Sequence, residues 1–563
     1  MRQELRKLSF GLRSVGLLCS LVSLGALAAG CSSGDKPVSG RSGEHVGSTQ
    51  AAVAGIDGSP TISAAGTVVN QYTTLAANPA LNATSIQVTS VAALANGADA
   101  IAAGDLILIM QMQGATINTT ATDATWGQVT ALGSAGLYEF AEVVAVDATN
   151  RVLTLACGLH NVYTTGGQTQ VIRVPQYDTL TVGLGGSITA PAWDGAVGGV
   201  VAVHAKTTIT LTGDVVASAL GFRGGTADDS SQASTTDVAI YNSVAAADGA
   251  RKGEGIAGFL TTQFGRAPAA NGGGGGNSHN GGGGGGGNGR SGGAWSGQGF
   301  FDLTVTGGST AWLLDPGYSV AGSEGGGRGG YSYSANDLNA LMVGPGNAGW
   351  GGNSRRERGG LGGHPLDNDP ATRIFLGGGG GAGDGNNQHA GGGGRGGGIV
   401  ILLAPTVNGT GHIYANGQNG VPANSVATPP ANGDAPGGAG AGGSVIVRGT
   451  TVTGITVQAD GGVGGIQTLA NGNEAEGPGG GGGGGYVSVN GTPAGATANG
   501  GPGGTTTAAP LSEFPSNGAT KGNTGQVLLG VNATGTVPYC SDTTAPDTTI
   551  ATLSDGPDRR YDG

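Results

Sequence analysis

The chain contains 563 residues, and 122 of them are glycine, about three times the usual share of roughly 7%. Aromatic residues supply only 5% and charged residues only 11%, which excludes both an ordinary globular core and a charged, disordered chain; collagen is excluded because glycine does not fall at every third position. The net charge of −12 argues against nucleic acid or anionic lipid as an electrostatic partner.

The first 31 residues are typical of an export signal. Basic residues precede an apolar stretch, Val15 to Ala29, which is shorter than the ~20 residues that span a bilayer. The stretch ends in Ala28-Ala29-Gly30-Cys31, which resembles the lipobox of bacterial lipoproteins. The resemblance implies cleavage before Cys31, acylation of its sulfur, and transfer to the outer membrane because Ser32 follows; a plain secretory peptide cut near Ala29 is the alternative.

Residues 32–55 are rich in Ser, Gly and charge and predict a flexible tether. Residues 56–180 then show period-two alternation of apolar and polar residues, with Gly, Asp and Asn between the runs. The alternating runs are residues 85–88, 105–112, 138–146, 151–155 and 170–174. They predict a small antiparallel barrel or sandwich.

The titratable residues of this small domain do not predict a catalytic site. Glu139 and Glu142 fall on opposite faces of one strand, so that they cannot converge as an acid–base pair, and we expect them to lie on the solvent face. Cys157 and His160 lie close in sequence, but a structural cysteine is the expected role of Cys157 in an exported protein.

A recurring phrase organises residues 181–535. Glycines open an alternating apolar strand near positions 198, 397, 442, 484 and 525, and the last four openings are 45, 42 and 41 residues apart. Regular spacing of one strand motif is typical of a repeat architecture, in which stacked coils bury their apolar rows together. We expect a right-handed β-solenoid; a sandwich of the same strands is the alternative.

Residues 226–396 form a glycine-rich insert within this repeat. Its polyglycine runs are residues 272–276, 281–287 and 377–381. One interpretation is a flexible linker, because glycine buries little and has the most backbone entropy to lose. The other is a set of extended, threefold segments that lie side by side and hydrogen-bond to each other, and we expect such order at least in part.

Dense glycine also produces chance motifs. GxGxxG strings occur without a surrounding strand–helix unit, so no nucleotide site is expected, and Gly381 to Asp384 is an isolated fragment of a calcium repeat. His279, His364 and His389 lack zinc-ligand spacing. We therefore predict no catalytic residues, no cofactor and no metal.

Two alternatives to a purely structural role remain open. A polysaccharide lyase or hydrolase needs acids and bases that converge on neighbouring coils, but Lys206 and Asp214 have no counterparts in later repeats. A carbohydrate-binding module needs a row of exposed aromatic side chains. The candidates for such a row are Trp193, Trp295, Trp312 and Trp350.

The tail, residues 536–563, contains Cys540. Once Cys19 is removed and Cys31 acylated, Cys157 and Cys540 are the remaining thiols, and an oxidising compartment permits a disulfide between them. Residues 542–550 resemble the opening strand of bacterial immunoglobulin-like repeats. Because such domains have about a hundred residues, we expect a truncated record or a disordered tail.

Several phrases resemble one family. Residues 104–114, 170–177 and 221–225, with the Ala-Pro-Asp-Thr sequence of the tail, resemble myxobacterial exported proteins known as adventurous gliding motility proteins, over most of residues 60–550. The resemblance implies a part in surface motility and no catalytic residues. The expectation is an all-β, non-enzymatic, outer-membrane lipoprotein that acts as a cell-surface scaffold or adhesin, with extracellular polysaccharide or envelope proteins as partners.

Overall fold

The computed structural model describes residues 57–227, 240–259, 263–277, 280–303, 312–313, 321–331, 359–385, 389–424, 434–468, 476–533, 535 and 537–539. All of them belong to one compact unit, Gln50–Gly563. The predicted signal, the tether, Cys31 and Cys540 lie outside the described residues. Among the described residues, no helix is long and apolar enough to cross a membrane.

The described secondary structure is β, with a few short 3-10 helices, which confirms the all-β prediction. These short helices are η1 (Ala92–Leu94), η2 (Thr165–Gly167), η3 (Ala246–Asp248), η4 (Ala509–Leu511) and η5 (Gly530–Asn532). Two small two-stranded sheets pair β6 (Thr116–Ile117) with β7 (Val129–Ala131), and β18 (Ala423–Asn424) with β22 (Gln467–Thr468).

A six-stranded antiparallel sheet contains all five runs predicted for residues 56–180. Its strands, in spatial order, are β3 (Gln71–Thr74), β10 (Thr169–Val174), β5 (Leu106–Gln111), β8 (Tyr138–Asp147), β9 (Val152–Leu155) and β4 (Ser85–Gln87). Strand β5 is buried along its whole length. One of its faces, with Ile107 and Ile109, packs within the sheet's own core, whereas Leu108 and Met110 pack against the strands that follow.

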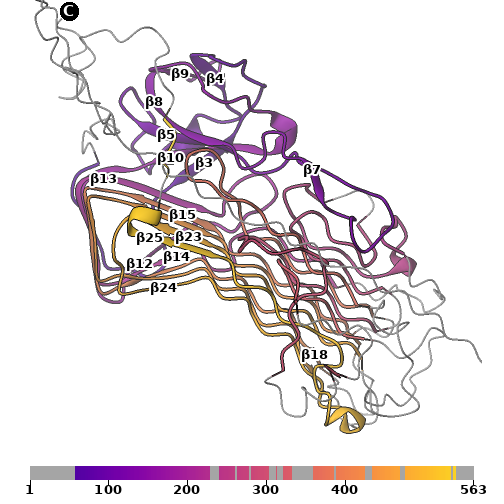
Figure 1. Cartoon of the computed structure of the whole chain (residues 1–563). Helices are drawn as coiled ribbons and strands as arrows, with labels where there is room; N and C mark the ends of the chain where they lie inside the picture. Colours follow the sequence, from indigo (N-terminus) through magenta and orange to yellow (C-terminus); the bar gives the residue numbers. More distant parts are fainter. Residues whose placement is uncertain are drawn as a thin grey trace, which may run out of the picture. The chain divides into compact units, whose positions relative to one another are not determined.

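The glycine-opened strands lie side by side in one parallel sheet, as the spacing predicts (Figure 1). Its order is β1 (Thr61–Ile62), β11 (Gln176–Val182), β13 (Val200–Leu211), β15 (Ile399–Leu403), β19 (Ser444–Arg448), β23 (Tyr486–Val489) and β25 (Gln526–Leu529), with β16 (Thr406–Gly409) and β20 (Thr451–Val452) beside this path. The register aligns Val201, Val400, Val445 and Val487 in one row. Each fully buried side chain of this kind contributes about 1.5–3 kcal/mol.

The closing phrases form a second parallel sheet. Its order is β2 (Thr67–Val68), β12 (Ser187–Thr189), β14 (Asp214–Val216), β17 (His412–Tyr414), β21 (Thr456–Gln458) and β24 (Gly495–Thr497). The row Val215, Ile413, Val457 belongs to the same hydrophobic core as the valine row of the first sheet. The two sheets and the core between them are called the strand stack below.

The described glycine runs continue from these strands as segments that lie side by side (Figure 1). Around residues 282–287 the hydrogen bonds follow a period of three. The amides of 282 and 285 donate to segment 327–330, those of 283 and 286 to segment 436–439, and those of 284 and 287 to segment 271–274. The carbonyls of the same six residues accept from segments 360–363, 378–381 and 480–483.

Residues 282–287 are therefore bonded to six neighbouring segments, and we call this assembly the glycine bundle. Bond directions that repeat every third residue are those of a threefold extended helix. The ordered alternative predicted for the glycine runs is confirmed for the described residues, and the linker alternative is wrong there.

Close packing of backbones explains most of these glycines. A Cβ on Gly286 would lie 2.0 Å from the Gly378 carbonyl oxygen, and one on Gly285 would lie 2.0 Å from that of Gly481. Neither glycine has a positive φ. A left-handed backbone is needed at the first opening, where Gly198 and Gly199 have φ values of +99° and +76°, but close approach is the general reason.

Candidate functional site

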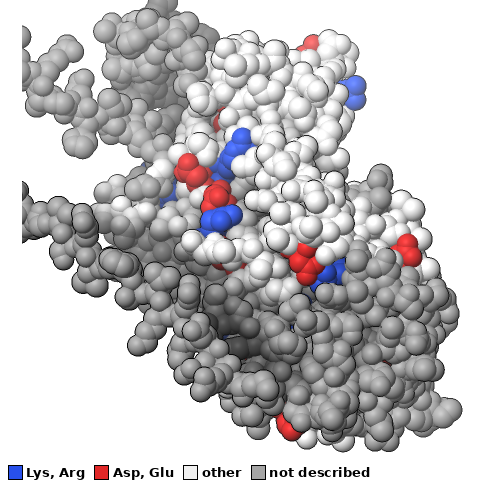
Figure 2. Space-filling view, turned by 45° about the vertical axis from the view of Figure 1, so that its right-hand side comes forward, with Lys and Arg blue, Asp and Glu red and all other residues white. Residues whose placement is uncertain are grey.

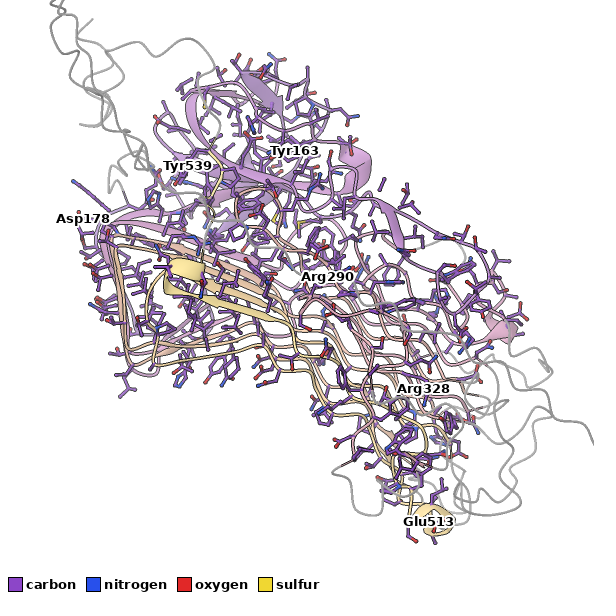
Figure 3. All side chains as sticks on the ribbon, viewed as in Figure 1. Tyr163, Asp178, Arg290, Arg328, Glu513 and Tyr539 are labelled. Atoms are coloured by element: carbon purple, nitrogen blue, oxygen red, sulfur yellow. The ribbon has the colours of Figure 1, made fainter. Side chains whose placement is uncertain are left out.

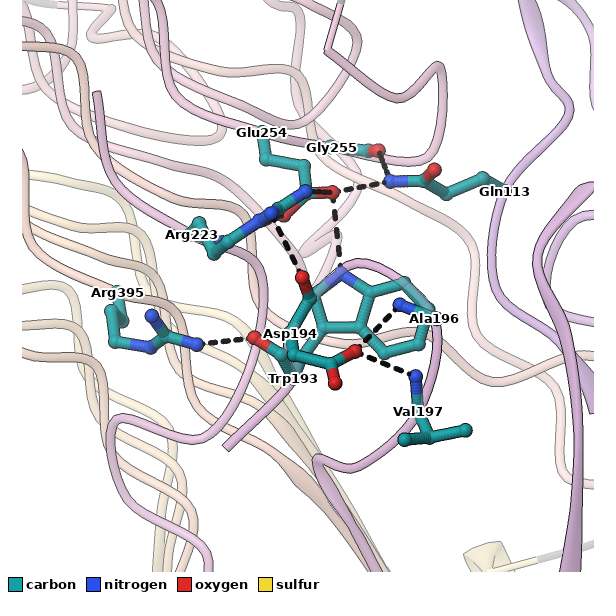
Figure 4. Close-up of polar contacts among 9 residues, drawn as sticks. All are labelled: Gln113, Trp193, Asp194, Ala196, Val197, Arg223, Glu254, Gly255 and Arg395. Carbon is teal, nitrogen blue, oxygen red and sulfur yellow. Dashed lines mark hydrogen bonds and ion pairs between the residues drawn. The ribbon is translucent and has the colours of Figure 1, made fainter. Parts of the chain in front are cut away.

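Charged and polar side chains converge around Glu254 (Figure 4). Its side chain is 1% exposed and is paired with Arg223 at 2.9 Å. Gln113 comes from the loop after β5, Trp193 and Asp194 precede β13, and Arg395 precedes β15. Segments that are distant in sequence therefore meet at one buried carboxylate.

Every hydrogen-bonding position of Glu254 is used by protein groups. One carboxylate oxygen, Oε1, accepts from Gln113 Nε2 at 2.8 Å, Trp193 Nε1 at 3.2 Å and Arg223 Nη2 at 3.0 Å. The other, Oε2, accepts from the amide and Nε of Arg223. A carboxylate bonded in this way has no free position for a substrate proton, so the cluster fits a structural joint better than an acid–base site.

Other buried charges are also bonded to protein groups. Lys252 Nζ donates to the carbonyls of Tyr241, Gly265 and Ala267, which uses all three of its protons. Burial is the main cause that lowers the pKa of Lys252. In the antiparallel sheet, Arg173 pairs with Asp105 at 3.0 Å.

The structure corrects the expected place of Glu139. Its side chain is fully buried instead of lying on the solvent face, and its two oxygens accept the amides of His160 and Asn161 at 2.9 and 3.0 Å. The alternation rule fails here because β8 is covered on both faces, and the carboxylate satisfies loop amides instead of water. Glu142 is half-buried.

The candidate cysteine and histidine residues do not form a reactive site in the described part of the chain. Cys157 is disulfide-bonded, and His160 is exposed. His364 Nε2 donates to the Trp126 carbonyl, and burial lowers the pKa of His364 to about 4. No group of three or more metal-ligating side chains occurs among the described residues; His279 lies outside them.

The tryptophans do not form the exposed row that a carbohydrate-binding module would need. Trp193 and Trp312 are fully buried. Trp295 is half-buried, stacks on His364 and donates to the Gly362 carbonyl. Trp350 lies outside the described residues.

An outward row of polar and aromatic side chains follows the second parallel sheet instead. Asp214 Oδ1 lies 3.2 Å from His412 Nδ1, and the two side chains are 39% and 43% exposed. The rings of His412 and Tyr414 stack, with centroids 5.4 Å apart and planes 8° from parallel. Tyr414 is aligned with Gln458, and Gln458 with Thr497, on the next two strands.

The polar row continues beyond the strands. The Asn416 side chain accepts the Asp460 amide at 2.8 Å, and Asp460 accepts the Asn499 amide and the Thr497 hydroxyl. We define the ladder face as the outward side chains of Asp214, His412, Tyr414, Gln458, Asp460 and Thr497. Within this face His412 is bonded to Asp214 and Thr497 to Asp460, across strands that are spaced ~4.8 Å apart.

The chemistry of the ladder face suits an uncharged, hydroxyl-rich ligand. A stacked, partly exposed aromatic pair offers an apolar surface with a polar edge, and the neighbouring carboxylates and amides accept or donate hydrogen bonds. On the described surface that Figure 2 shows, the charged side chains are scattered, often beside neighbours of opposite sign, and do not form a continuous basic area.

Sequence reasoning missed the ladder face, although a signal was present. His412 and Tyr414 flank Ile413, as Thr456 and Gln458 flank Val457, and such alternation places the flanking residues on one face. No protein-family model matches the chain, and no match is found among curated proteins or solved structures.

Proposed function

We propose that the chain is a non-enzymatic cell-surface lipoprotein that serves as a structural and adhesive scaffold, built as a right-handed β-solenoid whose coils extend into the glycine bundle. The observation that carries the proposal is the period-three bonding of residues 282–287 to six neighbouring segments. Each such hydrogen bond contributes about 0.5–1.5 kcal/mol net. Hydrogen bonds in several directions favour a stiff body. The Glu254 carboxylate, whose hydrogen-bonding positions are all used by protein groups, supports a role without catalysis.

The proposed anchor depends on Cys31. Acyl chains bury methylenes at ~0.8 kcal/mol each, so that several chains hold a protein firmly at a membrane. We expect radiolabelled fatty acid to enter the wild-type protein, and Cys31→Ala to remove both the label and the membrane fraction. Labelling that survives Cys31→Ala would contradict the anchor. A part in gliding would be tested by disruption of the gene followed by a surface-motility assay.

The proposed adhesive surface is the ladder face, and its proposed ligand is a neutral extracellular polysaccharide. Sugar rings would stack on Tyr414 and His412 while their hydroxyls bond to the flanking Asp and Gln side chains. The test is affinity electrophoresis through gels that contain soluble dextran, hydroxyethyl cellulose or glycol chitin as the probe.

We expect at least one of these polysaccharides to retard the wild-type protein, and Tyr414→Ala to abolish the retardation. Lys206→Ala, an exposed change outside the ladder face, is the matched control, and its retardation relative to a gel without polysaccharide should equal that of wild type. Equal retardation of wild type and Tyr414→Ala would refute this ligand site. Release of unsaturated or reducing sugars by the wild-type protein would instead favour a lyase or hydrolase.

A further inference from the structure

The described chain begins at the junction of its antiparallel and parallel sheets. The Asp57 amide donates to the Gln176 carbonyl at 3.1 Å, and the Gln176 amide donates to Asp57 Oδ2 at 2.6 Å. Thr61 then pairs with Thr181 in β11. Gln176 also accepts the Leu106 amide through Oε1, so that the first described residues are bonded directly next to β5.

The last described residues return to the same antiparallel sheet. The Phe140 amide of β8 donates to the Pro538 carbonyl at 2.8 Å, and Tyr539 forms a parallel bridge with Phe140. The two rings stack with centroids 5.3 Å apart. Figure 3 shows Tyr539 near the antiparallel sheet, on the side where Asp178 lies, whereas Arg328 and Glu513 lie in the glycine-rich part.

Cys157 lies at the edge of this contact. It follows β9, and the neighbouring Ala156 amide donates to the Glu142 carbonyl of β8 at 2.9 Å. Cys157 is disulfide-bonded, and the other cysteines of the chain are Cys19, Cys31 and Cys540. Cys540 directly follows Tyr539. Tyr539 forms its bridge with Phe140 of β8, two residues before Glu142.

We propose that Cys157 is bonded to Cys540, and that this clasp closes residues 158–539 into a loop that is not stretched when the chain is pulled from its two ends. The loop contains the glycine bundle and the whole strand stack except β1 and β2. The force would pass from Asp57 through the antiparallel sheet to Cys157, across the sulfur–sulfur bond, and out after Cys540. About 380 residues would be bypassed, which correspond to about 1,300 Å of fully extended chain.

The clasp would add resistance to stretching to the proposed scaffold. The disulfide itself depends on neither the lipid anchor nor the ladder face. A chain pulled between its membrane anchor and a point after Cys540 would keep the coils of the loop folded, whereas a load applied at the ladder face, which lies inside the loop, would still reach them. Under the end-to-end pull, the coils would unfold only after the clasp opened. Dithiothreitol reduces the clasp by thiol–disulfide exchange. Its two thiols supply two electrons and two protons, so that two cysteine thiols form and dithiothreitol becomes a cyclic disulfide.

Single-molecule force spectroscopy tests this inference on the full chain, with one peptide tag inserted within residues 32–55 and another fused after Gly563. The oxidised protein should extend by no more than roughly 350 Å from residues 57–157, plus its tails. After dithiothreitol, or with Cys540→Ser, the extension should grow by about 1,300 Å. The reduced wild type serves as the second arm if the variant fails to fold.

An oxidised wild type that extends through the full length of the chain would overturn the inference. A peptide map without reduction adds an independent check. It should contain one cross-linked pair that joins the Cys157 and Cys540 peptides, and a pair that joins Cys157 to Cys31 would also overturn the inference.

Discussion

The strand stack and the glycine bundle are consecutive parts of the same coils, but different atoms hold them together. Val445 is fully buried and lies between Val400 and Val487, so that side chains fill the space between the sheets. Seven residues earlier, Gly438 donates to the Gly381 carbonyl and accepts from the Gly394 amide. A Cβ on Gly438 would lie 2.1 Å from the Gly284 oxygen, so that backbones alone fill that space.

One repeat unit can therefore use two kinds of core. In the strand stack the free energy of folding comes mainly from apolar area removed from water. In the glycine bundle little apolar area is available, and stability depends on satisfying each buried amide and carbonyl. The stability of the strand stack should therefore fall gradually as side-chain volume is removed. The glycine bundle should tolerate almost no added side-chain volume.

The largest effect is expected from a side chain added inside the glycine bundle. In Gly286→Val the new Cβ would lie 2.0 Å from the rigid Gly378 carbonyl, and overpacking costs typically ~1–3 kcal/mol even where side chains can move. Because only backbone surrounds this position, we expect loss of the cooperative thermal transition in calorimetry.

Gly495→Val is the matched control for that substitution. Its Cβ would meet only Thr456 Cγ2, at 3.7 Å, so that the change in stability should stay within about 0.5 kcal/mol. If Gly286→Val melts like Gly495→Val, the glycine bundle is not packed as described.

A graded loss is expected in the strand stack. Ile413 is fully buried in β17, so that Ile413→Val should cost about 0.5–1.5 kcal/mol and Ile413→Ala about 2–5 kcal/mol of unfolding free energy. Denaturant titration measures both. An all-or-none loss of folding with the valine variant would show instead that the two regions respond alike to a change in side-chain volume.

A pH-dependent effect of similar size is expected from acid, and one buried histidine in or beside each region reports it. Burial lowers the pKa of His364, beside the glycine bundle, and of His204, in β13, to about 4. The unfolded value is ~6.5, so the unfolded chain binds more protons between these values, and stability falls as pH falls from about 6.5 to about 4.

Each histidine should contribute up to about 3 kcal/mol to that loss. Melting temperatures measured across this pH range should fall less steeply for His364→Gln and for His204→Gln. The exposed His160→Gln is the control and should keep the wild-type slope. Identical slopes in all four proteins would contradict the burial of both histidines.

Much of the fold could be predicted because local spacing determines it. Glycine openings at intervals of 45, 42 and 41 residues mark coils that β15, β19, β23 and β25 place next to each other. The runs in residues 56–180 also became strands. The partner of a strand is harder to predict when a long insert intervenes, as between β13 and β15.

Local spacing does not determine which residues are buried, or which side chains from distant segments meet, so these features could not be predicted. Glu139 alternates like a surface residue, but a loop of the same sheet covers it and bonds to it. The Asp214–His412 pair joins residues 198 positions apart, and the Glu254 carboxylate accepts from three other segments, through Gln113, Trp193 and Arg223. Such contacts depend on tertiary packing, which period and composition do not contain.

Amide hydrogen exchange in the native protein tests most directly whether the glycine bundle is an ordered core. The amides of residues 282–287 each donate to a neighbouring segment and should exchange only through large-scale opening. We predict protection comparable to that of Val445 and Ile446 in β19. Exchange of these glycine amides at the rate of an unstructured chain, while β19 stays protected, would contradict the account.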